Sequence, residues 1–223
     1  MEIKRKTGVI LALDVEEKEK AHQICQGVSR YVDAIKVGYP TVLACGIGIL
    51  KEISLYSKPV IADFKVADIP EISKKICKLA IDNGANFVIV HGFVGEDVIR
   101  ACSEVARIFV VADMSHPGAL DFISKESKKI AMLAKKYAYG IVAPATRVEQ
   151  IRKLRKIVGE LTIISPGIKS QGAKPGSAIS AGADFEIVGR SVYCSTNPKK
   201  AVLEILEMMA NVKLTKPNCD DEN

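Results

Sequence analysis

The chain has 223 residues, of which 48% are hydrophobic, 26% charged and 5% aromatic, with sixteen Gly, nine Pro and no Trp. These proportions are those of a globular domain and exclude collagen-like, low-complexity and disordered chains. Thirty-two Lys and Arg against 26 Asp and Glu leave a net charge of +6, a mild excess that favours small anionic substrates over nucleic acid.

Short apolar runs rich in β-branched residues recur at regular intervals. They lie at residues 9–13, 34–37, 60–64, 87–90, 108–112, 140–143, 162–164 and 185–188. Stretches with the apolar spacing of helices separate them, at 21–28, 42–50, 72–80, 98–105, 130–137 and 151–158, and another follows at 202–209. This alternation predicts a parallel sheet. Residues 171–183 contain three Gly and one Pro, so we expect only one or two helical turns there.

Two of these units resemble each other. Residues 81–90 and 179–188 share Ile, Gly, Ala, Phe, Ile and Val positions, so we expect Gly84 and Gly182 to end helices in a left-handed conformation. Eight βα units predict a single-domain α/β fold, a (β/α)8 TIM barrel over residues 1–212. The alternative, an open doubly wound sheet, usually carries G-x-G-x-x-G after its first strand, where this chain has LDVE. Residues 213–223 are polar, and we expect them to form a disordered tail.

No segment has the features of a membrane span or a secretory signal. The longest apolar stretch, residues 42–50, has nine residues, about half of the roughly 18 that a bilayer requires. The basic residues 1–6 are followed too soon by Asp14 to form a signal peptide. The six cysteines form no C-x-x-C pair, and we expect them to be reduced in a cytoplasmic protein that does not bind membranes.

Polar residues follow most of the predicted strands. In a barrel the carboxyl ends of all strands meet at one face, so these side chains share a pocket. The residues are Asp14, Lys36, Asp63 with Lys65, His91, Ser115, Pro144, Ser165 with Gly167, and Gly189 with Arg190. Solvated loop charges are the simpler interpretation of any one of them, but their matching positions favour a site.

The densest cluster is IADFKVADIP, residues 61–70. Asp63 and Lys65 are two residues apart on a strand, so their side chains share one face. Asp68 follows in the loop before a helix whose first turn we expect to contain Pro70. A lysine flanked by two carboxylates stays protonated and fixed, as a proton donor requires, although a local ion pair and a helix-capping acid would give the same pattern. Lys36, on the preceding predicted strand, adds a fourth charged residue to this cluster.

A second cluster follows the seventh and eighth predicted strands. It contains SPGIKSQG at 165–172 and VGRS at 188–191. Barrels commonly bind phosphate here, through backbone N–H groups and a cationic side chain such as Arg190. Residues 169–176 resemble a mobile lid. The spacing of His91 and His116 does not suggest a metal site, and the role of Asp113 stays open.

Six segments together resemble the orotidine 5′-phosphate decarboxylases of the short, archaeal type, and the resemblance runs from about residue 8 to residue 209. The segments are LALD at 11–14, IKVGYP at 35–40, ADFKVADIP at 62–70, MSHPG at 114–118, SPGIKSQG at 165–172 and VGRS at 188–191. The resemblance implies conversion of orotidine 5′-monophosphate to UMP and CO2, the last step of de novo UMP synthesis, without metal or cofactor.

The resemblance also implies roles for individual residues. Lys65 would protonate C6 of the pyrimidine, Asp63 would lie against the departing carboxylate, and Lys36 would hold Asp63 and the ribose. Asp68 and Ile69 would reach across a homodimer interface into the partner's site. The implied substrate contacts are Asp14 on the ribose, Ser115 on the base, Gln171, Gly189 and Arg190 on the phosphate, and Pro166. Ile72 departs from the family pattern, in which we expect a polar residue at the dimer-facing edge.

Two other functions compete with this one. Keto-sugar-phosphate decarboxylases and hexulose-phosphate synthases share Asp-x-Lys-x-x-Asp but depend on magnesium, and they have an acidic residue where this chain has Lys36. A lysine there opposes metal binding. A catalytically silent phosphate-binding barrel or a nucleic-acid binder would fit the sequence pI of 8.9, but no basic stripe interleaved with aromatic residues supports nucleic acid.

Overall fold

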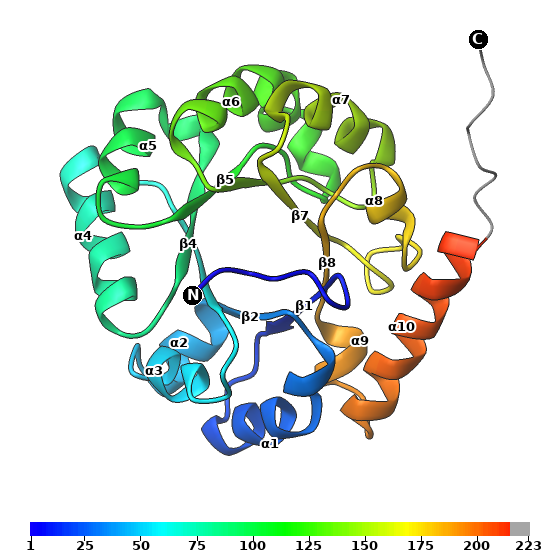
Figure 1. The fold of residues 1–223 in the computed structure, drawn as a ribbon. Helices are drawn as coiled ribbons and strands as arrows, with labels where there is room; N and C mark the ends of the chain where they lie inside the picture. Colours follow the sequence, from blue (N-terminus) through cyan, green and yellow to red (C-terminus); the bar gives the residue numbers. More distant parts are fainter. Residues whose placement is uncertain (215–223) are drawn as a thin grey trace, which may run out of the picture.

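Eight parallel strands form a closed barrel in sequence order, with β8 pairing back to β1 (Figure 1). The structure is a computed structural model that describes residues 1–214. The strands are β1 (Val9–Leu13), β2 (Ala34–Gly38), β3 (Val60–Val66), β4 (Phe87–His91), β5 (Ile108–Val111), β6 (Gly140–Val142), β7 (Thr162–Pro166) and β8 (Phe185–Val188). The predicted (β/α)8 barrel is confirmed, and the open sheet is excluded.

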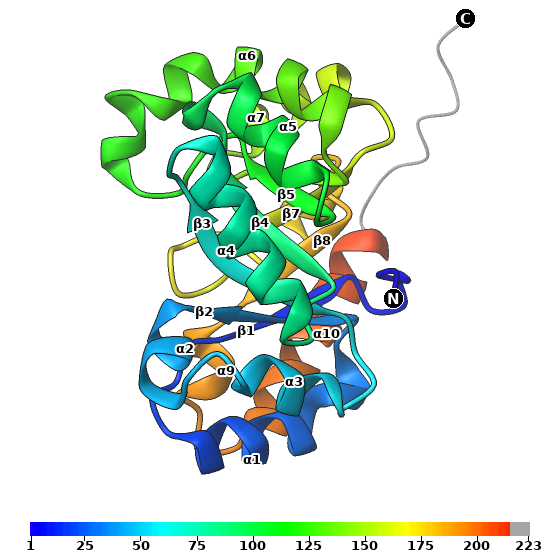
Figure 2. The same ribbon diagram turned by 90° about the vertical axis from the view of Figure 1, so that its left-hand side faces the viewer.

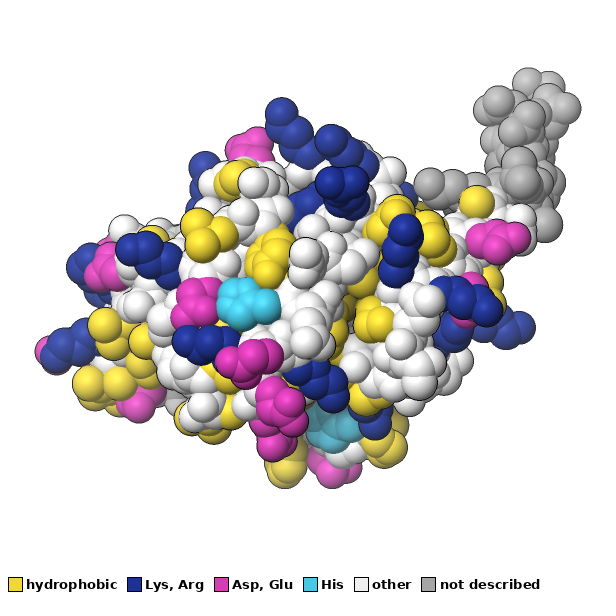
Figure 3. Space-filling model, turned by 90° about the horizontal axis from the view of Figure 1, so that it is seen from below, with side chains coloured by type: hydrophobic (Ala, Val, Ile, Leu, Met, Phe, Trp, Pro, Cys, Tyr) yellow, Lys and Arg dark blue, Asp and Glu magenta, His cyan; other side chains and the backbone are white. Residues whose placement is uncertain are grey.

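Helices surround the barrel on its outside (Figures 1 and 2). They are α1 (Lys18–Val28), α2 (Tyr39–Cys45), α3 (Ile49–Ser54), α4 (Pro70–Asp82), α5 (Glu96–Ser103), α6 (Ile123–Tyr137), α7 (Val148–Val158), α8 (Ser177–Ser180), α9 (Arg190–Tyr193) and α10 (Pro198–Leu214). Among the described residues, no helix combines the length and hydropathy needed to cross a bilayer. Seen from the side of α1, basic and acidic side chains are interspersed on the surface (Figure 3).

The barrel is filled at the amino ends of its strands and open at their carboxyl ends. Phe87 and Phe109 lie one inward position below Ile89 and Val111, and their rings are 5.5 Å apart. Tyr139 packs against both rings, at 4.7 and 5.4 Å. These aromatic side chains close the barrel interior at the amino ends of the strands, and a pocket lined by polar residues lies at the carboxyl ends.

Two helix predictions need correction. The apolar spacing over 42–50 predicts one helix, but α2 ends at Cys45 and α3 begins at Ile49, with Gly46 and Gly48 between them. Helix α4 turns the small residues Ser73, Cys77 and Ala80 toward the barrel, whereas Leu79 of the predicted apolar face is 53% exposed. Small side chains allow the helix to approach the strands closely, so burial here does not follow hydrophobicity alone.

Other expectations hold. The single turn α8 is the only helical segment within 171–183, and Gly84 and Gly182 have φ of +101° and +109° before β4 and β8. Five cysteines, at positions 25, 45, 77, 102 and 194, are free thiols. Helix α10 ends at Leu214, two residues beyond the predicted end of the barrel. The rest of the expected tail, 215–223, and its Cys219 lie outside the described residues.

Candidate active site

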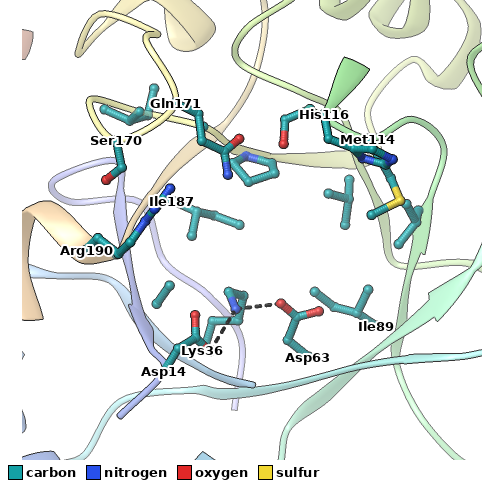
Figure 4. Close-up of a pocket in the computed structure, with 18 of the residues that line it drawn as sticks. Asp14, Lys36, Asp63, Ile89, Met114, His116, Ser170, Gln171, Ile187 and Arg190 are labelled. Carbon is teal, nitrogen blue, oxygen red and sulfur yellow. Dashed lines mark hydrogen bonds and ion pairs between the residues drawn. The ribbon is translucent and has the colours of Figure 1, made fainter. Parts of the chain in front are cut away.

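A cavity of about 370 Å³ opens at the carboxyl ends of the strands (Figure 4). Nine of the predicted site residues line it: Asp14, Lys36, Asp63, Lys65, Ser115, Pro166, Gln171, Gly189 and Arg190. They come from six different βα units, so only barrel closure brings them together. Asp68 and Ile69 do not line the cavity of their own chain. The expectation that His91, Pro144 and Ser165 share the pocket is wrong, because these strand-end residues do not line it either.

A row of ion pairs crosses the floor of the cavity. Nζ of Lys36 lies 2.5 Å from Oδ2 of Asp63 and 3.9 Å from Oδ1 of Asp14. Nζ of Lys65 donates to the other oxygen of Asp63 at 2.7 Å. The side chains of Lys36 and Asp63 are 7% and 8% exposed, whereas that of Lys65 is 38% exposed. Both oxygens of Asp63 are therefore occupied by ammonium groups, and of these two cations Lys65 is the more accessible to a ligand.

The charges in this row stabilise one another. Burial alone would raise the pKa of Asp63, but the charges and hydrogen bonds of Lys36 and Lys65 lower it to about 2. Burial lowers the pKa of Lys36, but the neighbouring charges of Asp63 and Asp14 outweigh burial, so the net shift is upward. Asp63 and Lys36 are therefore both charged at neutral pH.

An irregularity in β3 places Lys65. The strand pairs regularly with β4 through Ala62, and the register shifts before Val66. Lys65 lies in this bulge with φ of +42°, which is unusual for a lysine. Phe64 points the other way and stacks on Tyr39, with ring centroids 5.4 Å apart. The predicted meeting of Asp63 and Lys65 is confirmed, but it depends on a strained backbone and not on regular strand alternation alone.

Asp68 and Ile69 lie outside the cavity in the loop before α4. The loop is attached to the first turn of α4 by Ser73, whose buried Oγ accepts from the N–H of Asp68 at 3.1 Å and donates to its carbonyl at 2.8 Å. Oδ1 of Asp68 accepts from the N–H of Ile69, and the N-cap of α4 is Ile69 with no side-chain cap. Asp68 is therefore not the helix-capping acid of the simpler interpretation, and α4 begins at Pro70 as predicted.

A compact loop after β7 forms one wall of the cavity. The N–H of Lys169 donates to the carbonyl of Ala173 at 2.8 Å, and the N–H of Ala173 donates to the carbonyl of Gly167 at 3.2 Å. Gln171 lies at the tip, and its side chain points into the same end of the cavity as Arg190 (Figure 4). A lid motion of this loop stays a prediction.

Several lining residues were not predicted from the sequence. Tyr193 lines the cavity one helical turn after Arg190, and this i+3 spacing was the available signal. Asp113, left open above, is fully buried in the cavity wall. Its Oδ1 accepts from Ser124 at 2.6 Å and from Arg147 at 3.2 Å, while Oδ2 has no hydrogen-bond partner among the described residues. Arg147 lies 34 positions after Asp113 in the sequence, so no local sequence pattern predicts that the two side chains meet.

His91 and His116 have different surroundings. His116 lines the cavity beside Ser115 at the start of a short 3₁₀ turn. His91 ends β4 and packs against Phe93 with ring centroids 4.5 Å apart, but its buried Nδ1 has no partner in the described part of the chain. Burial, and then the charge of Lys65, lower the pKa of His91 to about 4.

The described side chains do not support a metal centre. No group of three or more His, Cys, Asp or Glu residues between residues 1 and 214 is arranged to hold a metal ion. In the cavity, the carboxylate of Asp63 faces two ammonium groups, which would repel a cation placed beside it.

Comparisons with known proteins agree with this geometry. A model of the family described as "Orotidine 5'-phosphate decarboxylase / HUMPS family" matches residues 7–205. An orotidine 5′-phosphate decarboxylase of Methanosarcina mazei is 51% identical over 212 residues, covering 92% of this chain and 96% of that protein. One of Pyrococcus furiosus is 40% identical over 202 residues, covering 89% and 96%.

A solved structure resembles the chain equally well. The crystal structure of orotidine 5′-monophosphate decarboxylase from Methanocaldococcus jannaschii, complexed with inhibitor BMP, has a TM-score of 0.86 and 44% identity, and the match covers 91% of this chain and 98% of that chain. The family match, the identity and the shared barrel agree along nearly the whole length. This chain belongs to the orotidine 5′-phosphate decarboxylase / HUMPS family.

Proposed function

We propose that this chain decarboxylates orotidine 5′-monophosphate to UMP and CO2 in pyrimidine biosynthesis. The observation that carries the proposal is the position of Lys65, which Asp63 holds at 2.7 Å while 38% of its side chain stays exposed at the cavity. The relatives at 40–51% identity cited above are orotidine 5′-phosphate decarboxylases, which favours this branch of the family over the sugar-phosphate branch.

The proposed reaction exchanges one bond for another at C6 of the pyrimidine. The bond between C6 and the carboxylate breaks, CO2 leaves, and the electron pair stays on C6. The ammonium of Lys65 stabilises this negative charge and gives its proton to C6, after which the lysine regains a proton from water. Asp63 lies against the departing carboxylate, and the repulsion between them decreases as CO2 leaves. Lys36 holds Asp63 and the ribose.

The remaining lining residues bind the substrate in this proposal. Asp14 binds ribose hydroxyls at one end of the row, and Ser115 binds the base. Gln171, Gly189 and Arg190 bind the phosphate, next to Pro166 at the end of β7. A Cβ at Gly189 would make only ordinary contacts, 3.4 Å from Ala12 and Tyr193, so packing within the protein does not require a glycine there. Close approach of a phosphate oxygen to the backbone would explain why this position is a glycine.

The reaction needs neither metal nor organic cofactor in this proposal. A magnesium-dependent relative needs an acidic ligand where this chain places Lys36, and the ammonium of Lys36 takes the oxygen of Asp63 that a cation would use. Binding energy from the phosphate end would supply part of the rate, because Arg190 and Gln171 contact a part of the substrate that does not react. The free thiols of the described cysteines fit a cytoplasmic enzyme.

The working unit is a homodimer in this proposal. Asp68 and Ile69 project from the rim of the barrel, with Ile69 62% exposed, and would complete the site of the partner subunit. Other exposed apolar side chains follow the neighbouring strands β2 and β4: Leu43 is 80% exposed and Phe93 is 63% exposed. Burial of these side chains between two rims would provide the hydrophobic contact that a dimer needs.

The decisive experiment follows the absorbance of orotidine 5′-monophosphate with purified, EDTA-treated protein. We expect turnover without added metal, and we expect Lys65→Ala to remove turnover while UMP still binds. Loss of activity on EDTA treatment, or turnover of a keto-gulonate phosphate, would assign the chain to the magnesium-dependent branch. Normal turnover by Lys65→Ala would show that the proposed proton donor is wrong.

A further inference from the structure

Glu186 is a buried carboxylate that the proposed mechanism does not use. It lies on β8, pairs with Ser165 of β7 and Val9 of β1, and has no measurable exposure. None of the described lysines and arginines lies within ion-pair distance of it, and burial raises its pKa despite the opposing effects of its hydrogen bonds and of Arg5. Burying a charged group in such a place costs free energy, so its presence needs a structural reason.

The contacts of Glu186 lie at the end of the loop that carries Gln171. Oε2 accepts from the N–H of Gly176 at 2.8 Å, and Oε1 accepts from the N–H groups of Ala178 and Ile179 at 2.8 and 3.3 Å. The three donors are the residue that ends the loop and the first turn of α8. One side chain thus satisfies three backbone groups of a segment with little regular structure.

The loop has two attachment points, and Glu186 provides one of them. At its first end, Gly167 follows β7 directly, and its carbonyl accepts a hydrogen bond from the N–H of Ala173. From Ala173 the chain continues to Gly176, which packs against Val212 of α10 so closely that a Cβ would lie 3.0 Å from it. The hydrogen bonds that Glu186 accepts fix this second end to β8, the strand that leads directly to Gly189 and Arg190.

We propose that Glu186 is a positioning residue for substrate binding, which anchors the loop of residues 167–176 to β8 and so holds Gln171 opposite Arg190. Strand alternation explains the arrangement: Ile187 faces the cavity, Glu186 faces outward to the loop end, and Arg190 follows at the carboxyl end of the same strand. The inference rests on the proposed function, because it assigns phosphate binding to Gln171 and Arg190.

The test compares Glu186→Gln with the unchanged protein. The amide keeps one oxygen acceptor, but its NH2 group faces a backbone N–H, so at least one of the three hydrogen bonds is lost. We expect UMP to bind about tenfold more weakly, which corresponds to about 1.4 kcal/mol. We expect uridine, which lacks the phosphate, to bind as before, and amide hydrogen exchange to become faster at residues 167–179. Calorimetry and mass spectrometry give these readings.

Asp33→Asn is the matched control. Asp33 is also a buried carboxylate that accepts from three backbone N–H groups, those of Lys6, Thr7 and Gly8, at the amino end of the barrel. The carbonyl of Gly8 also accepts a hydrogen bond from the N–H of Glu186 on β8. This variant therefore shows the effect of a general weakening where β1 pairs with β8. We expect a lower melting temperature but an unchanged ratio of UMP to uridine affinity.

The outcomes separate the two proposals. If the unchanged protein turns over orotidine 5′-monophosphate and Glu186→Gln binds UMP normally, or loses UMP and uridine affinity equally, the positioning role is wrong. If the unchanged protein shows no turnover, the proposed function fails, while nucleotide binding and hydrogen exchange still decide whether Glu186 anchors the loop. Should Glu186→Gln not fold, Glu186→Asp keeps the charge but is one methylene shorter, and we expect a smaller loss of UMP affinity of the same kind.

Discussion

At the scale of single residues, the cavity separates a buried ion pair from an accessible cation. Lys36 and Asp63 are nearly inaccessible and form an ion pair that stabilises both charges. Lys65 also forms an ion pair with Asp63 but remains partly exposed. Isolated burial of either charge would be costly, and mutual pairing reduces this cost. The arrangement fixes the Nζ of Lys65 beside Asp63 while part of its side chain stays accessible at the cavity.

Arg190 gives a prediction at the same scale. Arg190→Ala removes the cation at the end of β8, and the loss of a charge-assisted hydrogen bond to phosphate predicts a 10- to 100-fold rise in KM for orotidine 5′-monophosphate, or about 1.5–3 kcal/mol. Steady-state kinetics with the nucleotide and with orotidine measures this, because the nucleoside lacks the phosphate. Arg152→Ala, on the exposed side of α7 and paired with Glu149, is the control. Equal losses for both substrates would contradict the assignment.

Sequence patterns located the charged row of Lys36, Asp63 and Lys65 better than its surroundings. Asp63 and Lys65 could be paired because strand alternation relates residues two apart, and Lys36 because parallel strands end at one face. The bulge at Lys65 could not be predicted, since its cause lies in the pairing of β3 with β4. Asp113 and Arg147 also meet through tertiary contacts alone.

At the scale of elements, the predicted alternation of strands and helices gave the barrel, and most errors concern helix boundaries and faces. Local spacing predicts a helix across 42–50, but the two glycines of that stretch allow the chain to turn between α2 and α3. The buried face of α4 depends on the strand surface that it covers, which a single helix pattern does not describe. Residues 171–183 were predicted correctly because Gly and Pro disfavour a long helix there.

The attachment of the loop before α4 gives a prediction for this scale. Ser73→Ala removes both hydrogen bonds that hold Asp68, so we expect turnover to fall by about tenfold while the free energy of unfolding changes by only about 1–2 kcal/mol. Turnover assays and urea denaturation measure the two effects. Ser127→Ala is a matched control, because Ser127 is a buried helical serine bonded to the carbonyl of Ser124. If both variants lose equal activity, the loop attachment is not specific.

At the scale of the whole molecule, the proposed dimer predicts complementation between two inactive variants. Lys65→Ala and Asp68→Ala chains are mixed, unfolded and refolded together. If Asp68 acts in the partner's site, each mixed dimer contains one intact site, and random pairing predicts about one quarter of full activity. Turnover assays after refolding measure this. If Asp68 serves its own subunit, the mixture stays as inactive as its components.

Stability should also depend on pH through His91. Its pKa is about 4 in the folded chain, below the ordinary value of 6.5, because burial and the charge of Lys65 disfavour the protonated ring. Between these values the unfolded chain binds a proton that the folded chain does not, so the free energy of unfolding falls as the pH falls from about 6.5 to 4. The pKa of Asp63 lies below this window. Melting curves of the unchanged protein and of His91→Gln should diverge across it, and parallel curves would contradict the role of His91.

The pairing of the first strand with the last has a consequence for synthesis on the ribosome. At about 5–20 residues per second, translation takes between about 10 and 35 seconds to proceed from β1 to β8. During that time β1 has an unpaired edge, which makes the nascent chain prone to aggregation. The cavity also lacks Arg190 until the end of this interval, so a ligand that binds through Arg190 cannot stabilise the nascent chain before β8 has been synthesised.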